Sequence, residues 1–385
     1  MSDHTADRLR GLVAAFLRTH DPGGDRTGFL RARFDAGLAW VHYPAGLGGL
    51  AAPPLLQPVV DAAFAEVDAP DNRPRRNSIG LGMAAPTLLR HGTDAQRRRW
   101  LRPLWTGEEV WCQLFSEPDA GSDLAGLRTR AVRDGDDWVV DGQKVWTSMA
   151  HEARWAILLA RTDPAVPKHH GITYFVCDMT APGVQVRPLR QLTGEAEFNE
   201  VFLTGVRVPD SLRVGAVGQG WQVARTTLMN ERVAIGGRPL PREGGMIGLL
   251  ARLWRERPEL RTDGLYQEVL HSWVRAEAAR LAALRLRQLV AAGQPGPEGS
   301  AVKLSFAELS QRISGLEVEL LGAEGLRHDD WAMRRPEEPD LLGRTATYRY
   351  LRARGNSIEG GTSEILRTII AERVLGLPAE PRVDR

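Results

Sequence analysis

The sequence predicts an α+β protein in which a helical segment, a β segment and a second helical segment follow one another along 385 residues. Three observations predict this order. Apolar residues recur at helical spacing up to about residue 110, alternate with a period of two between about residues 138 and 208, and return to helical spacing after about residue 214. We therefore expect an N-terminal α-helical domain over residues 1–110, a central β domain over residues 111–213 and a C-terminal α-helical domain over residues 214–385.

The N-terminal segment consists of short amphipathic runs that are separated by helix breakers. Residues 9–17 and 59–67 carry apolar side chains three and four positions apart, which is typical of a helix with one buried face. A cluster of Pro and Gly at residues 44–49 predicts a turn between such helices. Thr93 or Asp94 is placed to cap the next helix, because an oxygen at that position accepts a free backbone N–H.

The middle segment reads as strands and the last segment as long helices. Alternation of apolar and polar residues, together with β-branched and aromatic side chains, predicts four strands. These strands cover residues 138–142, 156–160, 172–176 and 201–208. A long helical pattern then follows over residues 266–292.

Composition excludes several classes of function. The net charge is only +2, and the basic residues, nearly all Arg, are interleaved with acidic ones, so we expect no nucleic-acid partner. Cys112 and Cys177 lack the spacing of metal ligands, and no metal site is expected. No run of about 18 apolar residues occurs, which predicts a cytoplasmic protein without a membrane partner.

Two motifs carry the functional information, one at residues 112–123 and the other at residues 141–148. A turn rich in Gly and Ser can bring backbone N–H and hydroxyl groups against the polar edge of a flat ring. Each motif could also be ordinary, with turn formers in the first and Trp146 filling a core in the second. In this order and spacing, the pair resembles the signatures of the acyl-CoA dehydrogenase family, whose members hold FAD and desaturate acyl thioesters. The α–β–α order resembles the fold of that family over essentially the whole chain.

The resemblance implies roles for individual residues of the two motifs. Phe115 and Ser116 would face the flavin carbonyls, and Trp146 and Ser148 would lie on the other side of the ring and at its N5. In the loop that follows Ser116, Gly121 would contact the cofactor. Ser122 would contact either the cofactor or the CoA portion of the substrate.

Desaturation requires a base that removes the α proton while a hydride leaves the β carbon for the flavin. In many family members this base is a Glu directly before a Gly-Thr-Ser sequence, where the present chain has Gly360, with Glu359 one residue early. Glu231, followed by Arg232, resembles the Glu-Arg pair that supplies the base in isovaleryl-CoA and long-chain acyl-CoA dehydrogenases. We therefore expect Glu231 to be the base, with Glu359 as the alternative, and Arg232 and Gly360 to contact the substrate. A surface role for Glu231 beside an Arg is the competing interpretation.

The far end of the cofactor departs from the family pattern. In the family, an Arg and a Gln contact the pyrophosphate of the FAD held by a neighbouring subunit. Here Gln267 replaces that Arg, and Glu319, ahead of Gly322, replaces that Gln. A glutamine brings no charge and a carboxylate would repel phosphate. Thr362 and Glu364 match family contacts to FAD, so FAD remains the expected cofactor.

The resulting expectation is an FAD-dependent dehydrogenase of fatty acid metabolism that acts on an acyl-CoA or acyl-carrier thioester and is re-oxidised by an electron-transfer flavoprotein. Two alternatives stay open: a flavin-dependent monooxygenase on the same fold, and a catalytically silent subunit of a heteromeric dehydrogenase. The expected assembly is a homo-oligomer, either a dimer or a tetramer, or a heterotetramer with a related chain.

Overall fold

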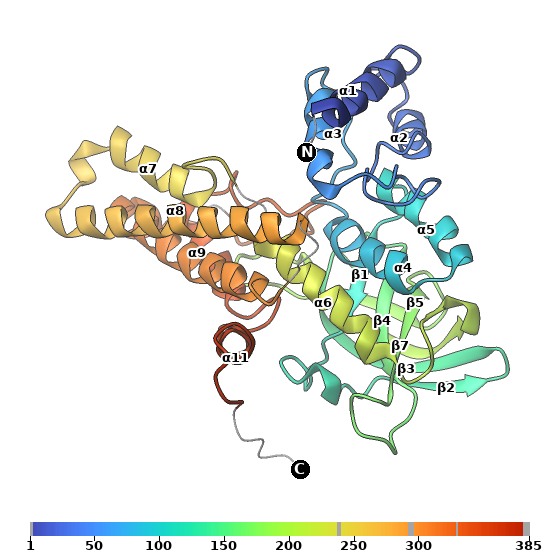
Figure 1. The fold of residues 1–385 in the computed structure, drawn as a ribbon. Helices are drawn as coiled ribbons and strands as arrows, with labels where there is room; N and C mark the ends of the chain where they lie inside the picture. Colours follow the sequence, from blue (N-terminus) through green and yellow to red (C-terminus); the bar gives the residue numbers. More distant parts are fainter. Residues whose placement is uncertain (1–2, 237–239, 292–295, 329, 380–385) are drawn as a thin grey trace. The chain divides into compact units, whose positions relative to one another are not determined.

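The computed structural model describes residues 3–236, 240–291, 296–328 and 330–379. The chain packs into two compact units (Figure 1). The first consists of Met1–Arg187 and Phe198–Thr227, and the second of Pro188–Glu197 and Leu228–Arg385. Helices precede and follow a sheet along the chain, so the α+β fold predicted from the sequence is confirmed. The division into three domains at residues 110 and 213 stays a prediction.

The first unit begins with helices. They are α1 (Asp3–Leu17), α2 (Arg26–Asp35), α3 (Gln57–Ala65), α4 (Ala85–His91), which follows a π-helical turn at Gly80–Ala84, and α5 (Asp94–Thr106). Helices α1, α2 and α3 share an apolar core. The rings of Phe16, Phe29 and Phe64 meet edge to face in this core. Thr93 caps α5: its hydroxyl accepts the N–H of Gln96 at 3.2 Å, and the Gln96 amide oxygen accepts the N–H of Thr93 at 3.0 Å. The predicted cap is thereby confirmed.

The strands of the described residues form one sheet in the order β6-β7-β3-β2-β4-β5-β8, with β1 beside β4. They are β1 (Trp111–Leu114), β2 (Arg130–Asp134), β3 (Asp137–Ser148), β4 (Trp155–Arg161), β5 (Ile172–Asp178), β6 (Val184–Pro188), β7 (Phe198–Pro209) and β8 (Arg213–Val214). The four strands predicted from alternation lie within β3, β4, β5 and β7 and are confirmed. Alternate residues of β3 and β7 enter one apolar core together with residues of β4 and β5, as their period of two requires.

The long strands β3 and β7 pair antiparallel, but their register is interrupted twice. It shifts between Val140 and Gly142 and again between Lys144 and Thr147. A bulge of this kind redirects the side chains that lie within it and is common beside functional sites. The second interruption contains Trp146, so the residue that the sequence singled out lies where the alternation of the strand is broken.

Helices make up most of the second unit. Helix α6 (Gly220–Gly236) runs from the first unit into the second, and it is followed by α7 (Met246–Glu256), α8 (Asp263–Ala291), α9 (Gly299–Leu321), α10 (Ala346–Asn356) and α11 (Ser363–Arg373). Helices α8 and α9 lie side by side (Figure 1). Leu250, Ile313 and Leu320 are buried in the core that α7, α8 and α9 share. None of the helices in the described ranges has the length and apolarity that crossing a membrane requires.

Candidate functional site

The two sequence motifs meet in the first unit. Strand β1 ends at Leu114, so Phe115 and Ser116 open the loop that follows it. The N–H of Val145, on β3, donates to the carbonyl oxygen of Ser116 at 2.9 Å. Phe115 is buried and Ser116 is half-buried. The backbone of the first motif is therefore bonded directly to the strand that carries the second.

A buried ion pair joins the same two motifs. Lys144 is fully buried on β3, and its Nζ lies 2.9 Å from Oε1 of Glu117 and 3.0 Å from the carbonyl oxygen of Phe115. The Glu117 carboxylate also accepts the N–H groups of Arg128 at 2.6 Å and Thr129 at 2.9 Å. The ammonium of Lys144 thus binds the backbone at Phe115, while the N–H groups of Arg128 and Thr129 bind the carboxylate of Glu117.

Electrostatics keep this pair ionised at neutral pH. Burial lowers the pKa of Lys144 to about 8, and the attraction of Glu117 limits that shift. Burial alone would raise the pKa of Glu117, but the charge of Lys144 and the hydrogen bonds from Thr129 and from the Arg128 backbone outweigh it and hold this pKa below its usual value. The two charges therefore depend on each other inside the protein.

Trp146 presents its ring to solvent instead of filling a core. Its side chain is 61% exposed, and its backbone has a φ of +59°, which a bulky aromatic residue rarely adopts. The ring of Phe198 meets it edge to face, with 6.0 Å between the ring centres. Ser148, two residues on, is half-buried at the end of β3. A strained, exposed indole beside a hydroxyl is a candidate surface for stacking a flat ring.

The loop that carries Gly121 and Ser122 is open to solvent. It leaves a tight turn in which the N–H of Glu117 donates to the carbonyl of Ala120 at 3.1 Å and the N–H of Ala120 donates back at 3.0 Å. Gly121 and Ser122 are both exposed, and a Cβ added at Gly121 would meet no atom within 4 Å. The structure itself therefore does not demand a glycine at this position.

In the second unit, Glu231 lies on α6 and is half-buried. Glycine occupies the first position of this helix, Gly220, where a Cβ would lie 2.6 Å from the carbonyl carbon of Thr173. Arg232 follows Glu231 in the helix, but its side chain lies outside the described part of the structure. The predicted contact between Arg232 and substrate stays a prediction.

Glu359 is held by an arginine. Its Oε2 lies 3.0 Å from Nη2 of Arg352, and its Oε1 lies 3.5 Å from Nη1 of the same residue. Nη2 of Arg352 also lies 3.1 Å from Oε1 of the buried Glu197. Burial raises the pKa of Glu197 even though Arg352 attracts its charged form. The guanidinium of Arg352 therefore forms ion pairs with two carboxylates, those of Glu197 and Glu359.

The residues after Glu359 form a glycine turn ahead of α11. Gly360 and Gly361 have φ values of +63° and +94°, a region in which only glycine is unstrained. Within the described residues, the N–H groups of both glycines make no hydrogen bond. Thr362 caps α11 by accepting the N–H of Ile365 at 3.3 Å, and Glu364 is exposed in the first turn. Two free N–H groups in a turn suit an oxygen that carries negative charge.

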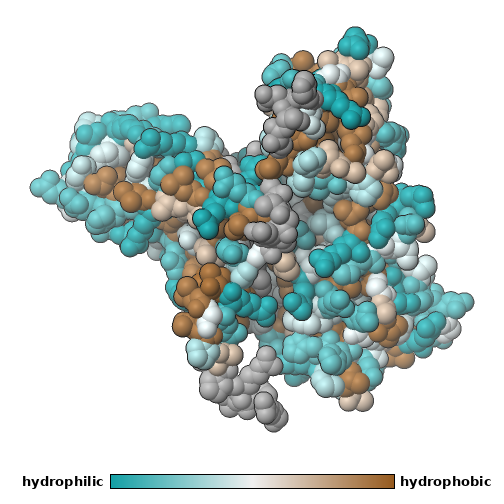
Figure 2. Space-filling model, viewed as in Figure 1, coloured by the Kyte–Doolittle hydropathy of each residue, from teal (hydrophilic) through white to brown (hydrophobic). Residues whose placement is uncertain are grey.

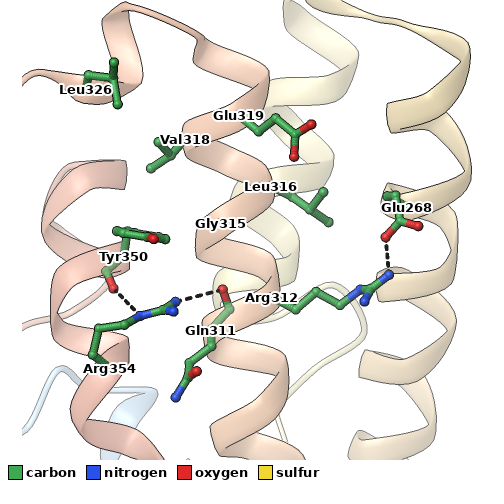
Figure 3. A pocket seen from close by; sticks show the side chains of 10 residues that line it. All are labelled: Glu268, Gln311, Arg312, Gly315, Leu316, Val318, Glu319, Leu326, Tyr350 and Arg354. Carbon is green, nitrogen blue, oxygen red and sulfur yellow. Dashed lines mark hydrogen bonds and ion pairs between the residues drawn. The ribbon is translucent and has the colours of Figure 1, made fainter.

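A pocket of about 500 Å³ lies between α8, α9 and α10 (Figure 3), and one of the two residues expected at the cofactor pyrophosphate lines it. Glu319 lines this pocket, whereas Gln267 is exposed on α8 and does not. Arg312 is paired with Glu268, and the guanidinium of Arg354 donates to backbone carbonyls. The two arginines are thus engaged, and the Glu319 carboxylate makes no ion pair with any described residue.

Gly322 follows Leu321, the last residue of α9, as its C-cap, with a φ of +57°. The structure therefore brings Glu319 and Gly322 to one end of α9, and it leaves Gln267 outside the pocket. Nothing in this arrangement supplies an unpaired cation for a phosphate. A carboxylate in that place favours a positively charged neighbour over an anionic one.

Sequence reasoning missed the ion pair of Lys144 with Glu117 and the role of Arg352. A signal was present for the first, because only three of the 50 basic residues are lysines and one of them lies inside the second motif. No signal pointed to Arg352, which is one arginine among many. Across the described ranges, no group of three or more His, Cys, Asp or Glu side chains could hold a metal ion.

Comparisons with known proteins agree with the motifs. Three family profiles match successive parts of the chain: the acyl-CoA dehydrogenase N-terminal domain over residues 5–108, the middle domain over residues 112–206 and the C-terminal domain over residues 218–375. Acyl-CoA dehydrogenase FadE34 of Mycobacterium tuberculosis is 44% identical over 350 residues, which are 89% of this chain and 45% of that protein. This chain therefore spans less than half the length of FadE34. Acyl-CoA dehydrogenase IpdE1 of the same organism is 39% identical over 387 residues, which cover 98% of this chain and 96% of IpdE1.

Solved structures show the same fold. The Tcur3481-Tcur3483 steroid ACAD superimposes with a TM-score of 0.74 at 27% identity, covering 99% of both chains. The ChsE4-ChsE5 complex of Mycobacterium tuberculosis superimposes with a TM-score of 0.73 at 28% identity, again covering 99% of both chains.

Proposed function

Because the chain belongs to the acyl-CoA dehydrogenase family, we propose that it is an FAD-dependent enzyme that introduces an α,β double bond into an acyl-CoA thioester. Members of this family are flavoprotein oxidoreductases. The observation that carries the proposal is the exposed ring of Trp146, which lies in strained backbone next to Ser148 on β3. Neither the fold nor the sheet needs that ring, so a ligand is the simplest reason for its place.

The residues of the first unit suit an isoalloxazine ring. Trp146 offers a flat aromatic face, Ser148 a hydroxyl, and the loop at Phe115 and Ser116 backbone groups that Lys144 holds in place. When bound, FAD supplies the acceptor for the hydride of the β carbon. The buried ion pair keeps the loop rigid, so the polar contacts to the ring are formed before it binds.

We assign the base to Glu231, which takes the α proton onto a carboxylate oxygen. Glu359 is less suited, because its carboxylate is already engaged in a charge-assisted pair with Arg352. Loss of the α proton moves negative charge onto the thioester oxygen. We assign the donor to that oxygen to the N–H of Gly360, which bonds to no residue that the structure describes. The chemistry requires the base and this donor to face the same substrate.

The substrate class follows from the related proteins. One of the superimposable structures is titled a steroid ACAD, and we infer that the present chain takes the CoA thioester of an acid that bears rings. An electron-transfer flavoprotein is the proposed acceptor of its electrons. Ser122, exposed on its loop, is proposed to contact the cofactor or the CoA portion.

Rapid anaerobic mixing tests the proposal. FAD-loaded protein is mixed with butyryl-CoA, octanoyl-CoA or cholanoyl-CoA, and the loss of the flavin absorbance is recorded; cholanoyl-CoA should reduce it fastest. Glu231→Gln should slow this reduction by about 10²–10⁴-fold at unchanged FAD content, the contribution of a general base. The matched Glu359→Gln should retain most of the parental rate, since an amide oxygen still accepts from Arg352. If Glu231→Gln reduced flavin normally and Glu359→Gln did not, the base would be Glu359.

A heteromeric assembly is a second candidate, and the pocket of Figure 3 favours it. By the family resemblance, the pyrophosphate of a second copy's FAD would approach the carboxylate of Glu319, and Glu268 nearby is already paired with Arg312. A related chain with a basic side chain there would fit better, and one superimposable structure is a complex of two named proteins, ChsE4 and ChsE5. Purified alone, this chain should then contain clearly less than one FAD per polypeptide, and co-expression with a related chain should raise that content.

A further inference from the structure

Lysine is rare in this chain, and two of its three lysines are fully buried. Lys144 and Lys303 have no exposed surface, whereas the side chain of Lys168 is 44% exposed. Burial of an ammonium costs several kcal/mol unless nearby groups compensate for the lost water. Lys144 has the carboxylate of Glu117 beside it. Lys303 is compensated differently, and its contacts indicate what it does.

The ammonium of Lys303 joins the two ends of one loop. Lys303 lies on α9, and its Nζ donates to the carbonyl oxygen of Asn356 at 2.9 Å and to that of Gly361 at 2.7 Å. Asn356 is the last residue of α10, and Gly361 directly precedes the cap of α11. The loop of residues 357–361 is therefore bound at both ends by the same nitrogen: at the carbonyl of Asn356 before it and at the carbonyl of Gly361, its last residue.

An ammonium suits this place better than other groups. The last carbonyls of α10 have no partner inside the helix and lie at the negative end of its dipole, so a cation there is favourable. A compact nitrogen with three donors reaches two converging carbonyls, whereas the wider, planar guanidinium of arginine would have to displace its neighbours. A chain that uses arginine almost everywhere retains lysine at this buried point.

The middle of the loop is held from a second direction. Arg352, which is on α10, pairs with Glu359 inside the loop and with Glu197 outside it. Between Glu359 and the second carbonyl bound by Lys303 lies Gly360, with its positive φ and an N–H that has no bond among the described residues. The residues on both sides of Gly360 are therefore bonded to other parts of the chain, Glu359 to Arg352 and Gly361 to Lys303.

We propose that Lys303 is a positioning residue that fixes the backbone of loop 357–361 and with it the direction of the Gly360 N–H. This proposal rests on the proposed function, in which that N–H receives the thioester oxygen. Lys303 contacts neither substrate nor cofactor. It acts through the carbonyls of Asn356 and Gly361, and without it one buried and one partly buried acceptor lose their donor while the loop gains freedom to move.

Lys303→Met tests the proposal, because methionine has nearly the same length and no donor. Ile313→Ala is the matched control: it lies on the same helix, is buried in the core shared with α7 and α8, and should destabilise the protein without touching the loop. The first readout is hydrogen exchange of the loop amides, followed by mass spectrometry on protein without added substrate. Exchange of the Ile358 and Glu359 amides, which donate to the Gly355 carbonyl, should accelerate at least about tenfold in Lys303→Met and stay parental in Ile313→Ala.

The second readout is flavin reduction by cholanoyl-CoA at a temperature at which both variants are folded. Lys303→Met should be slower by about 10–100-fold at similar KM, the size of effect that a small misplacement of a reacting group causes. Ile313→Ala should match the parent. Loop exchange equal to that of the control, or accelerated exchange with parental flavin reduction, would overturn the proposal.

Failure of the proposed function is distinguishable from failure of this inference. If no acyl-CoA reduces the parent protein, the dehydrogenase assignment falls, while hydrogen exchange still decides whether Lys303 fixes the loop. Should Lys303→Met not fold, Lys303→Arg takes its place. The larger guanidinium should also accelerate loop exchange, and parental exchange in a folded Lys303→Arg protein would refute the positioning role.

Discussion

The buried pair of Lys144 and Glu117 allows a quantitative prediction, with Lys144→Met as the perturbation. The substitution preserves the length of the side chain but removes the charge that faces Glu117 and the donor to the Phe115 carbonyl. A buried acceptor without a donor costs about 1–3 kcal/mol, and removal of one partner of a buried ion pair costs about 3–5 kcal/mol. Because the N–H groups of Arg128 and Thr129 still bind the Glu117 carboxylate, we expect the lower value, about 3 kcal/mol.

For a folding unit of this size, 1 kcal/mol shifts Tm by about 2–4 °C, so Lys144→Met should lower Tm by about 6–12 °C. Differential scanning calorimetry or far-ultraviolet circular dichroism measures this shift. FAD affinity should fall as well, since the backbone at Phe115 loses its support. The double variant Glu117→Gln with Lys144→Met should recover part of the loss, because the amide oxygen accepts the backbone N–H groups and the amide nitrogen can donate to Phe115.

Lys168→Met is the control for loss of a lysine as such. Lys168 pairs with Asp123 at 2.9 Å on the surface, and an exposed pair contributes at most about 1 kcal/mol. If Lys144→Met changed Tm no more than Lys168→Met, the buried pair would not be what holds the two motifs together, and the argument for a rigid loop at Phe115 would fail.

Three further predictions follow from the same structure. The pKa of Lys144 is about 8 in the folded protein and 10.5 ordinarily, so the folded protein releases this proton at lower pH than the unfolded chain. The free energy of unfolding should therefore rise between about pH 8 and 10.5 by at most about 3 kcal/mol relative to Lys144→Met. The same pH dependence for both proteins in chemical denaturation would contradict this. Gln267 lies outside the pocket that Glu319 lines, so Gln267→Arg should leave the FAD affinity of the isolated chain unchanged. A rise in affinity of about tenfold or more, measured by titration calorimetry, would instead place residue 267 at the pyrophosphate, as the family resemblance implies. Helix α8 exposes apolar side chains four residues apart at Tyr266, Leu270 and Val274, so Val274→Arg should shift an oligomer toward smaller species in light scattering, and an unchanged mass would exclude this face from the interface.

Apolar surface also gathers over α11 (Figure 2). Ile365 on α11 is exposed, as are Val374, Leu375 and Leu377, which follow the end of this helix at Arg373. Together with the exposed side chains of α8, they give the second unit apolar surface of the kind that the predicted assembly would cover. The number and identity of the chains in that assembly stay a prediction.

Local patterns in the sequence determined the elements and the kind of chemistry. The period of two placed strands within β3, β4, β5 and β7, because it depends on neighbours along the chain. The oxygen-bearing residues likewise predicted a helix cap at Thr93 or Asp94, and the structure has it at Thr93. The two motifs indicated a flavin site without any tertiary information, since they are short and contiguous. The family profiles agree with that interpretation.

Only the tertiary structure decided which of the open alternatives hold at single residues. Whether Trp146 fills a core or faces solvent depends on the interruption of pairing with β7, which no local pattern encodes. The pairing of Glu359 with Arg352, and of Lys303 with the ends of loop 357–361, joins side chains and carbonyls from separate helices. A buried charge must find its partner wherever the packed chain brings one, and that partner is set by the fold and not by distance along the sequence.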